Sequence, residues 1–271
     1  MPPKRQVYLL DPKNLSPETI AVTFAKTSRS PQRFIEIAAE LTDEKSAEFH
    51  EKWVVGYGHA SVAEHAVLHI AVENISRLAV ESLESCRLAS YTEKSTRYQK
   101  WTKEDYHLPA ELENHSLRSL YQETILGLFE AYEEALPKVR TLIQQQYPTR
   151  EGESENAWER RIRSKYVDIA RFYLPAAALA NVGVTINARA LEHTLTKMLS
   201  HPLSEVRQAG EEMKSVAQAC VPTLVKYANP SPYLQTAQQQ LQMLSEQTGS
   251  HAFPADWCNL IFWDRGAEDH I

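Results

Sequence analysis

Charged and hydroxyl-bearing side chains are concentrated in one segment of this chain, residues 86–98, with the sequence CRLASYTEKSTRY. Guanidinium groups and hydroxyls together suit a phosphate ester and the hydroxyls of a sugar, and a glutamate adds a hydrogen-bond acceptor. The same composition also describes a solvated helix end with surface charges, so the segment alone leaves both interpretations open. Its polar residues include Arg87, Ser90, Thr92, Glu93, Ser95, Thr96 and Arg97.

A second polar segment, Gly58–His65 (GHASVAEH), contains two histidines six residues apart. Two histidines that bind zinc from one helix stand four residues apart, so this spacing does not indicate a metal site. Ser61 and Glu64 have the spacing of a capping box, which predicts that a helix starts here.

Arginines also lie in two later segments. Arg171 is the one charged residue in the apolar stretch IARFYLPAAALA, where its desolvation has to be offset by an anion, either a buried carboxylate or a ligand. Arg189 and His193 are four residues apart and share one face of a predicted helix. These side chains are therefore candidates for binding an anionic ligand.

The elements that carry these residues are mostly helical. The chain has only 8 glycines and neither a GxGxxG nor a GxxxxGK[ST] motif, which disfavours turn-rich β folds and glycine-rich nucleotide loops. Alternating apolar residues predict a strand over Ala66–Ile75, and Asn74 or Ser76 is expected to cap the helix that follows. A second strand is predicted at Val7–Leu10. The fold class is therefore α+β, a modest antiparallel sheet packed with long helices.

Composition limits the classes of function. With 271 residues and a net charge of −6, the chain is expected to form one large domain without general affinity for nucleic acid. No apolar run is long enough to cross a membrane and the N-terminus lacks a secretory pattern, so we expect a cytoplasmic protein without a membrane partner. Cys86, Cys220 and Cys258 are expected to be reduced thiols rather than disulfides or metal ligands.

Loop, helix-stop and repeat signals in the second half of the chain predict the domain organisation. Gln144–Asn156 is expected to be a loop, and Asn229–Pro232 (NPSP) a helix stop. Cys258–Ile271 resembles Val7–Ile20, which indicates either an internal repeat or chance similarity. We therefore predict a main domain over 1–230, a linker or short helix over 231–257 and, over 258–271, the start of a second copy of a tandem protein.

Several motifs together resemble the flavin-dependent thymidylate synthases: GHASVAEH, AVENISRLA, the pattern R-L-A-S-Y-x-E-x-S-x-R-Y and NAR-x-L-x-H, over about residues 7–228. The resemblance implies an α+β domain that forms a homotetramer, with FAD and nucleotide bound where subunits meet. It also implies that methylenetetrahydrofolate, NADPH and dUMP are the substrates, and that C5 of dUMP receives the methyl group without a cysteine nucleophile.

The resemblance assigns roles position by position. The residues at flavin-contacting positions are Ser28, Ser61, Glu64, Arg87, Glu93, Asn187, Arg189 and His193. The residues at nucleotide-contacting positions are Glu93, Ser95, Thr96, Arg97 and Arg171, with Thr96 in place of a smaller residue.

Four positions depart from the family pattern. Ser85 and Cys86 stand where the Arg-His-Arg signature has its first two residues, Ser82 replaces a glutamine that holds dUMP, and Met198 replaces the arginine that polarises the uracil ring. A thioether cannot donate a hydrogen bond, and loss of one such donor typically lowers a rate by about 10²–10³. Lys197 is cationic but lies about 100° away around the helix. We expect weak or absent thymidylate synthesis by this chain alone, and expect that Met198→Arg together with Ser85→Arg raises dUMP affinity or turnover.

Three functions remain open from the sequence: an enzyme that methylates dUMP or a related uracil nucleotide, a non-catalytic flavin- and nucleotide-binding homologue, and one half of a composite tandem enzyme. A homo-oligomer, or a pseudo-oligomer made of tandem copies, is expected in each case. No catalytic residue is assigned.

Overall fold

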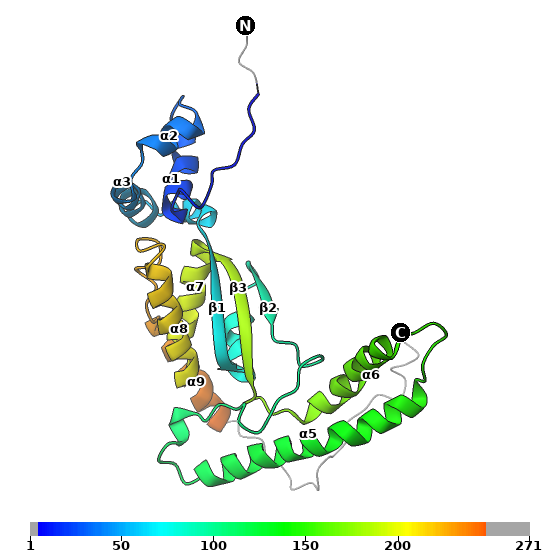
Figure 1. The fold of residues 1–271 in the computed structure, drawn as a ribbon. Coiled ribbons are helices and arrows are strands. Elements are labelled where there is room, and N and C mark those ends of the chain that lie inside the picture. The colour runs from blue at the N-terminus through cyan, green and yellow to red at the C-terminus, as the bar shows by residue number, and fades with distance from the viewer. Residues whose placement is uncertain (1–4, 248–271) are drawn as a thin grey trace, which may run out of the picture. The chain divides into compact units, whose positions relative to one another are not determined.

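The computed structural model describes residues 5–247, and the chain divides into two compact units between Gln235 and Thr236. In the first unit, the described residues form a three-stranded antiparallel sheet in the order β1-β3-β2 (Figure 1). The strands are β1 (Val67–Ser76), β2 (Ala89–Glu93) and β3 (Leu179–Asn187). A small antiparallel sheet among long helices confirms the predicted α+β class.

Alternation of side chains explains the strands. In β1, Leu68 and Ile70 are buried whereas His69 on the opposite face is exposed, as the period of two predicts. The central strand β3 buries every second residue from Ala180 to Ile186. One face of the sheet therefore belongs to the core.

The main core lies between this face and three helices: α4 (Arg77–Glu84), α7 (Ala188–Leu199) and α8 (Ser204–Gln218). Figure 1 shows α7 and α8 running beside β1 and β3. Ser76 ends β1 and begins α4, because its Oγ accepts a hydrogen bond from the Ala79 amide at 3.1 Å. This confirms the predicted helix start and fixes the first turn of α4 at the end of the sheet.

Two long helices, α5 (Arg118–Gln146) and α6 (Glu155–Ala170), pack against each other around a second core that includes Phe129 and Ile162. The predicted loop over Gln144–Asn156 is confirmed but is shorter, because α5 continues to Gln146 and α6 starts at Glu155.

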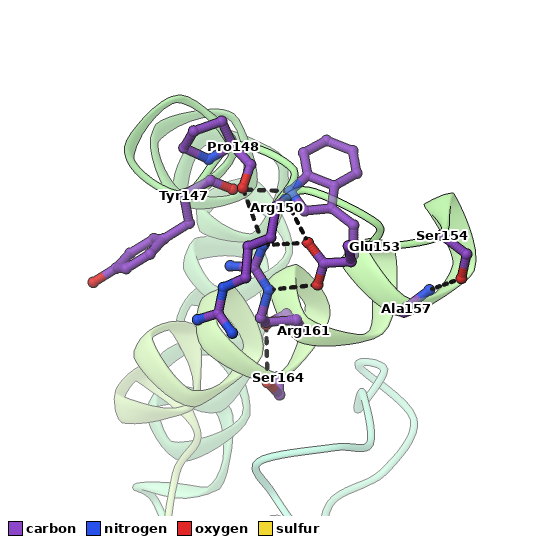
Figure 2. Close-up of polar contacts among 9 residues, drawn as sticks. Tyr147, Pro148, Arg150, Glu153, Ser154, Ala157, Arg161 and Ser164 are labelled. Atoms are coloured by element: carbon purple, nitrogen blue, oxygen red, sulfur yellow. Dashed lines mark hydrogen bonds and ion pairs between the residues drawn. The ribbon is translucent and has the colours of Figure 1, made fainter.

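Polar contacts fix the turn between these helices (Figure 2). Arg161 Nε and Nη2 donate to the two carboxylate oxygens of Glu153 at 2.8 and 2.7 Å, and Nη2 also donates to the carbonyl of Pro148 at 3.0 Å. The Arg161 guanidinium lowers the pKa of Glu153 to about 2. Hydrogen bonds and an ion pair therefore hold the connection between α5 and α6 in place.

The N-terminal part contradicts two predictions. Val7–Leu10 is not a strand: among the described residues no strand pairs with it, and Val7 and Leu9 are 89% and 93% exposed. Ser61 does not cap a helix, since it lies inside a 3₁₀-helix whose N-cap position is His59. The elements here are α1 (Pro17–Thr27), α2 (Phe34–Glu40), α3 (Asp43–Phe49), the π-helix η1 (His50–Gly56) and the 3₁₀-helix η2 (Ala60–His65).

Two short 3₁₀-helices, η3 (Ala110–Leu112) and η4 (Arg171–Tyr173), and the helix α9 (Pro232–Gln247) complete the described elements. None of the α9 residues is buried. Cys258–Ile271 lies outside the described residues, so the tandem organisation and the domain boundaries stay predictions. No described helix is both long and apolar enough to cross a membrane.

Candidate functional site

Three of the five residues predicted to bind the nucleotide line a pocket of about 520 Å³ that we call the Arg171 pocket, whereas Ser95 and Arg97 do not line it. Thr96 follows β2, Glu93 ends β2, and Arg171 follows α6 in η4. Chain segments that are about 75 residues apart in the sequence thus place an arginine, a hydroxyl and a carboxylate around one cavity.

The polar contacts in this pocket hold Arg171 in position. Arg171 Nη1 donates to Thr96 Oγ1 at 3.3 Å, and Arg171 Nε lies 2.9 Å from the Asp168 carboxylate. Arg97 binds the same carboxylate at 3.0 Å. Ser95 Oγ accepts a hydrogen bond from the Arg97 backbone amide, which shapes the turn after β2. Asp168 therefore orders two of the predicted arginines side by side.

Most residues that line this pocket were not predicted, among them Arg77, Phe172 and Trp101. Arg77, in the first turn of α4, bonds Glu93 at 2.7 Å and Glu81 at 2.8 Å. Phe172 is 82% exposed and the Arg171 guanidinium lies 5.3 Å from its ring centre, whereas Trp101 is almost fully buried. Only the fold brings them to the cavity. For Arg77, the sequence offered one indication of a role in a site, its charge between the apolar residues Ile75 and Leu78.

Predicted flavin-binding residues line a second cavity, of about 770 Å³, that we call the Arg189 pocket. Asn187 is the N-cap of α7, and its side chain accepts a hydrogen bond from the Ala190 amide at 2.9 Å. The first turn of α7 forms part of the cavity wall. Arg189 forms an ion pair with Glu64 of η2. His193 lines the cavity one turn further along α7, as its four-residue spacing from Arg189 predicted.

The charges of the Arg189 pocket favour an anion at its rim. Arg87 is exposed between two lining residues, Cys86 and Leu88, and has no ion pair among residues 5–247. Burial raises the pKa of Glu192, the other acid in the wall besides Glu64, with His193 partly opposing this. Arg87 is thus a guanidinium at this rim without a carboxylate partner among the described residues.

Ser28 and Ser61 line a third cavity, of about 460 Å³, that we call the Ser61 pocket. Its floor includes Trp53, whose ring stacks on Tyr57 with centroids 5.0 Å apart, and the Arg29 guanidinium lies 4.8 Å from the centre of the Trp53 ring. Because η2 supplies Ser61 to this cavity and Glu64 to the Arg189 pocket, one short helix borders both.

One chain therefore does not gather all predicted flavin residues in one cavity. Glu64, Asn187, Arg189 and His193 line the Arg189 pocket, Ser28 and Ser61 line the Ser61 pocket, and Glu93 lines the Arg171 pocket. Their assignment to a flavin stays a prediction.

The departures from the family pattern have partners of their own. Lys197 Nζ donates to Ser85 Oγ at 3.0 Å, and Ser82 Oγ lies 3.3 Å from Nε2 of His201. Burial lowers the pKa of His201, and the charge of Arg207 acts in the same direction. These contacts put one lysine, rather than the family's arginine and histidine, beside the end of α4.

Met198 is 1% exposed and belongs to the main core. It faces Gly210 of α8 so closely that a Cβ added there would lie 3.0 Å from the Met198 Cβ. The expectation that arginine at 198 strengthens nucleotide binding does not fit this environment, because a guanidinium would be buried between α7 and α8.

Comparison with known proteins establishes the family. The family described as thymidylate synthase complementing protein, Thy1, matches residues 10–223. The chain belongs to this family. Among Thy1 relatives, the flavin-dependent thymidylate synthase of Clostridium tetani is 30% identical over 218 residues, 80% of this chain and 84% of that protein.

Other similar proteins differ in length or only share the fold. A UPF0159 protein of Chlamydia pneumoniae is 32% identical over 222 residues, which cover 77% of this chain and 42% of the relative, so the chain spans less than half of that protein. The solved flavin-dependent thymidylate synthase ThyX of Helicobacter pylori, complexed with FAD and dUMP, has a TM-score of 0.50 at 19% identity, covering 79% of this chain and 96% of that chain. This likeness supports the Thy1 fold.

Proposed function

We propose that this Thy1 protein binds a uracil nucleotide in the Arg171 pocket and FAD at the Arg189 pocket, and that it methylates C5 of the uracil. The observation that carries the proposal is the convergence of Arg171, Thr96 and Glu93 on one cavity. The family relationship and the FAD and dUMP named for the Helicobacter pylori structure support the choice of ligands.

The Arg171 pocket fits the three parts of a nucleotide. Arg171 and Arg77 offer guanidinium groups for the phosphate, and the Glu93 carboxylate can accept from a sugar hydroxyl or from the N3–H of uracil. The exposed ring of Phe172 gives the planar base an apolar surface on which to stack. Arg77 uses two of its five N–H donors on Glu81 and Glu93, so further donors remain for a phosphate.

The Arg189 pocket fits a dinucleotide pyrophosphate through its donor set. Arg87 has unused guanidinium donors, Arg189 keeps donors beyond its bond to Glu64, and His193 stands beside it in the wall. When bound, FAD would supply the redox and one-carbon transfer chemistry, with NADPH and methylenetetrahydrofolate as co-substrates. The protein's part is to hold the flavin next to the Arg171 pocket, which Glu93 at the end of β2 borders.

We also infer that the working site contains more than one copy of this domain. The flavin residues of one chain are divided among three cavities, so neighbouring copies are needed to enclose a molecule as long as FAD. A homotetramer is the arrangement that the family implies, and a tandem protein is the alternative. Light scattering of the purified protein with and without FAD distinguishes them.

A composite or non-catalytic protein is the second candidate function. Ser82, Ser85 and Met198 stand at positions that the family uses to bind dUMP, and their present contacts favour this second candidate. Ser82 lies beside His201, Ser85 accepts a hydrogen bond from Lys197, and Met198 is part of the core. In a composite enzyme the missing arginines come from a second domain.

The test uses the purified full chain. Yellow colour and flavin absorbance test FAD binding, calorimetric titration with dUMP and UMP tests the nucleotide pocket, and release of tritium from C5 of labelled dUMP with NADPH and methylenetetrahydrofolate tests turnover. Binding of both ligands without tritium release supports the second candidate. Absence of flavin binding contradicts both.

A further inference from the structure

A smaller cavity of about 220 Å³, which we call the His107 cavity, lies where the first turns of α4, α5 and α8 approach one another. Its wall is mainly apolar, and the cavity binds neither of the ligands of the proposed function. Its lining includes Leu78, His107, Tyr121, Ala177, Leu203 and Glu205.

Most polar groups around the cavity already have partners. Glu205 accepts from the Ser76 backbone amide at 2.7 Å and from its Oγ at 2.6 Å. Glu111, also in the wall, accepts from the Ser204 amide at 2.7 Å. Both carboxylates are thereby held at the starts of α4 and α8, and neither is left as a counter-charge for a bound ion.

His107 is the exception. Its backbone is fixed, because its amide donates to the Ala177 carbonyl at 2.9 Å and its carbonyl accepts from the Tyr121 hydroxyl at 3.0 Å. Its Nδ1 lies 3.6 Å from the Glu205 carboxylate. Its Nε2 is buried and has no hydrogen-bond partner among the described residues. An unpaired buried polar atom is costly, so each one calls for an explanation.

The position of Glu205 indicates the chemistry of the missing partner. A carboxylate next to Nδ1 favours the tautomer with hydrogen on Nδ1, which leaves Nε2 as an acceptor. The partner therefore carries an O–H or N–H donor. The rest of the wall, with Leu78, Tyr121 and Leu203, suits an apolar body.

We propose that the His107 cavity is a binding site for a small uncharged molecule that has one aromatic ring or a similar apolar body and one hydroxyl or amide donor directed at His107 Nε2. The volume supports this size, because a cavity of about 150 Å³ in another protein accommodates benzene. It is below the range of about 300–1,000 Å³ that is common for larger ligands.

The site is separate from the Arg171 pocket but shares a wall with it. Leu78 and Ala176 line both cavities. The Leu78 amide donates to the Ala176 carbonyl at 3.0 Å, so a backbone hydrogen bond joins the two residues of this shared wall. A ligand in the His107 cavity thus touches two residues that also border the nucleotide pocket. The site itself does not depend on the proposed function.

The test compares phenol with toluene, which has nearly the same shape but no donor. Each is titrated into the full chain and followed by saturation-transfer difference NMR. We expect saturable phenol binding with a dissociation constant of about 1 mM and toluene binding about threefold to tenfold weaker, the usual effect of one hydrogen bond.

Variants locate the site. His107→Phe removes the acceptor and is expected to abolish the preference for phenol over toluene, whereas His115→Phe, at an exposed position, is expected to retain it. Ala177→Leu fills the cavity and is expected to abolish binding of both probes. Circular dichroism checks that each variant is folded. If Ala177→Leu does not fold, the phenol-to-toluene ratio of His107→Phe decides.

Two results overturn the proposal: no saturable phenol binding by the unmodified protein up to about 20 mM, or the same phenol-to-toluene ratio in His107→Phe as in the unmodified protein. Arg77→Met, which acts on the nucleotide pocket, is expected to leave phenol binding unchanged, so failure of the nucleotide site and failure of this site are distinguishable.

Discussion

The Arg77 guanidinium lies 2.7 Å from the Glu93 carboxylate and so joins the first turn of α4 to the end of β2. Both side chains are half-buried, at 30% and 24% exposure, and both border the Arg171 pocket. Glu93, which the sequence motif assigned to ligand binding, is thus oriented by a residue outside the motif.

Arg77→Met is expected to lower the affinity for dUMP by about 10-fold to 100-fold, since it removes a charged hydrogen-bonding group and leaves Glu93 free to repel the phosphate. Calorimetric titration measures the change. Arg163→Met, at an exposed position of α6, is the matched control and is expected to bind like the unmodified protein. Equal affinities of both variants would show that Arg77 only joins α4 to β2.

Arg87→Ala is expected to weaken FAD binding by more than about tenfold, because Arg87 is the exposed guanidinium at the rim of the Arg189 pocket that a pyrophosphate can engage at two points. Flavin absorbance after dialysis measures retention. Arg87→Lys is expected to recover only part of the affinity, since an ammonium is a point charge. Arg160→Ala, exposed on α6, is the control for loss of one positive charge.

How far the sequence predicts the fold depends on whether the deciding contacts are local. β1 and its following helix were predictable, because the alternation of Leu68 and Ile70 and the cap at Ser76 act within a few residues. Val7–Leu10 had the apolar composition of a strand, but a strand needs a neighbour to pair with, and no strand of residues 5–247 pairs with this segment.

Long-range contacts decided those features of the pockets that the sequence could not predict. Glu64 was expected to cap a helix locally, but its carboxylate binds Arg189, 125 residues further along the chain. Arg77 and Phe172 belong to no motif and become pocket residues only because α4, β2 and η4 meet. Arg189 and His193 were predictable as a pair, since the pitch of one helix fixes their common face.

Glu153→Gln is expected to lower the melting temperature at neutral pH, because it breaks the bidentate contact with Arg161 that fixes the α5–α6 turn (Figure 2). The pKa of Glu153 is depressed to about 2 in the folded protein. Its contribution is therefore fully present above the unfolded pKa of about 4.3 and is lost as the pH falls towards 2.

Melting curves of the unmodified protein and Glu153→Gln between pH 7 and pH 2 measure this difference. Glu151→Gln, at a neighbouring exposed position, is the control. A gap between the two melting temperatures that stays constant down to pH 2 would contradict the role of the ionised Glu153.

Met198→Arg is expected to destabilise the fold rather than strengthen nucleotide binding. Met198 is 1% exposed in the main core and lies against Gly210, so an arginine would either bury an unpaired charge or push α8 away from α7. Such a change typically costs more than about 3 kcal/mol, whereas the volume-conserving Met198→Leu costs less than about 1.5 kcal/mol. Urea unfolding of both variants measures the contrast. Similar midpoints for the two would show that a side chain at 198 can leave the core, in which case position 198 would again be a candidate for contact with the uracil ring.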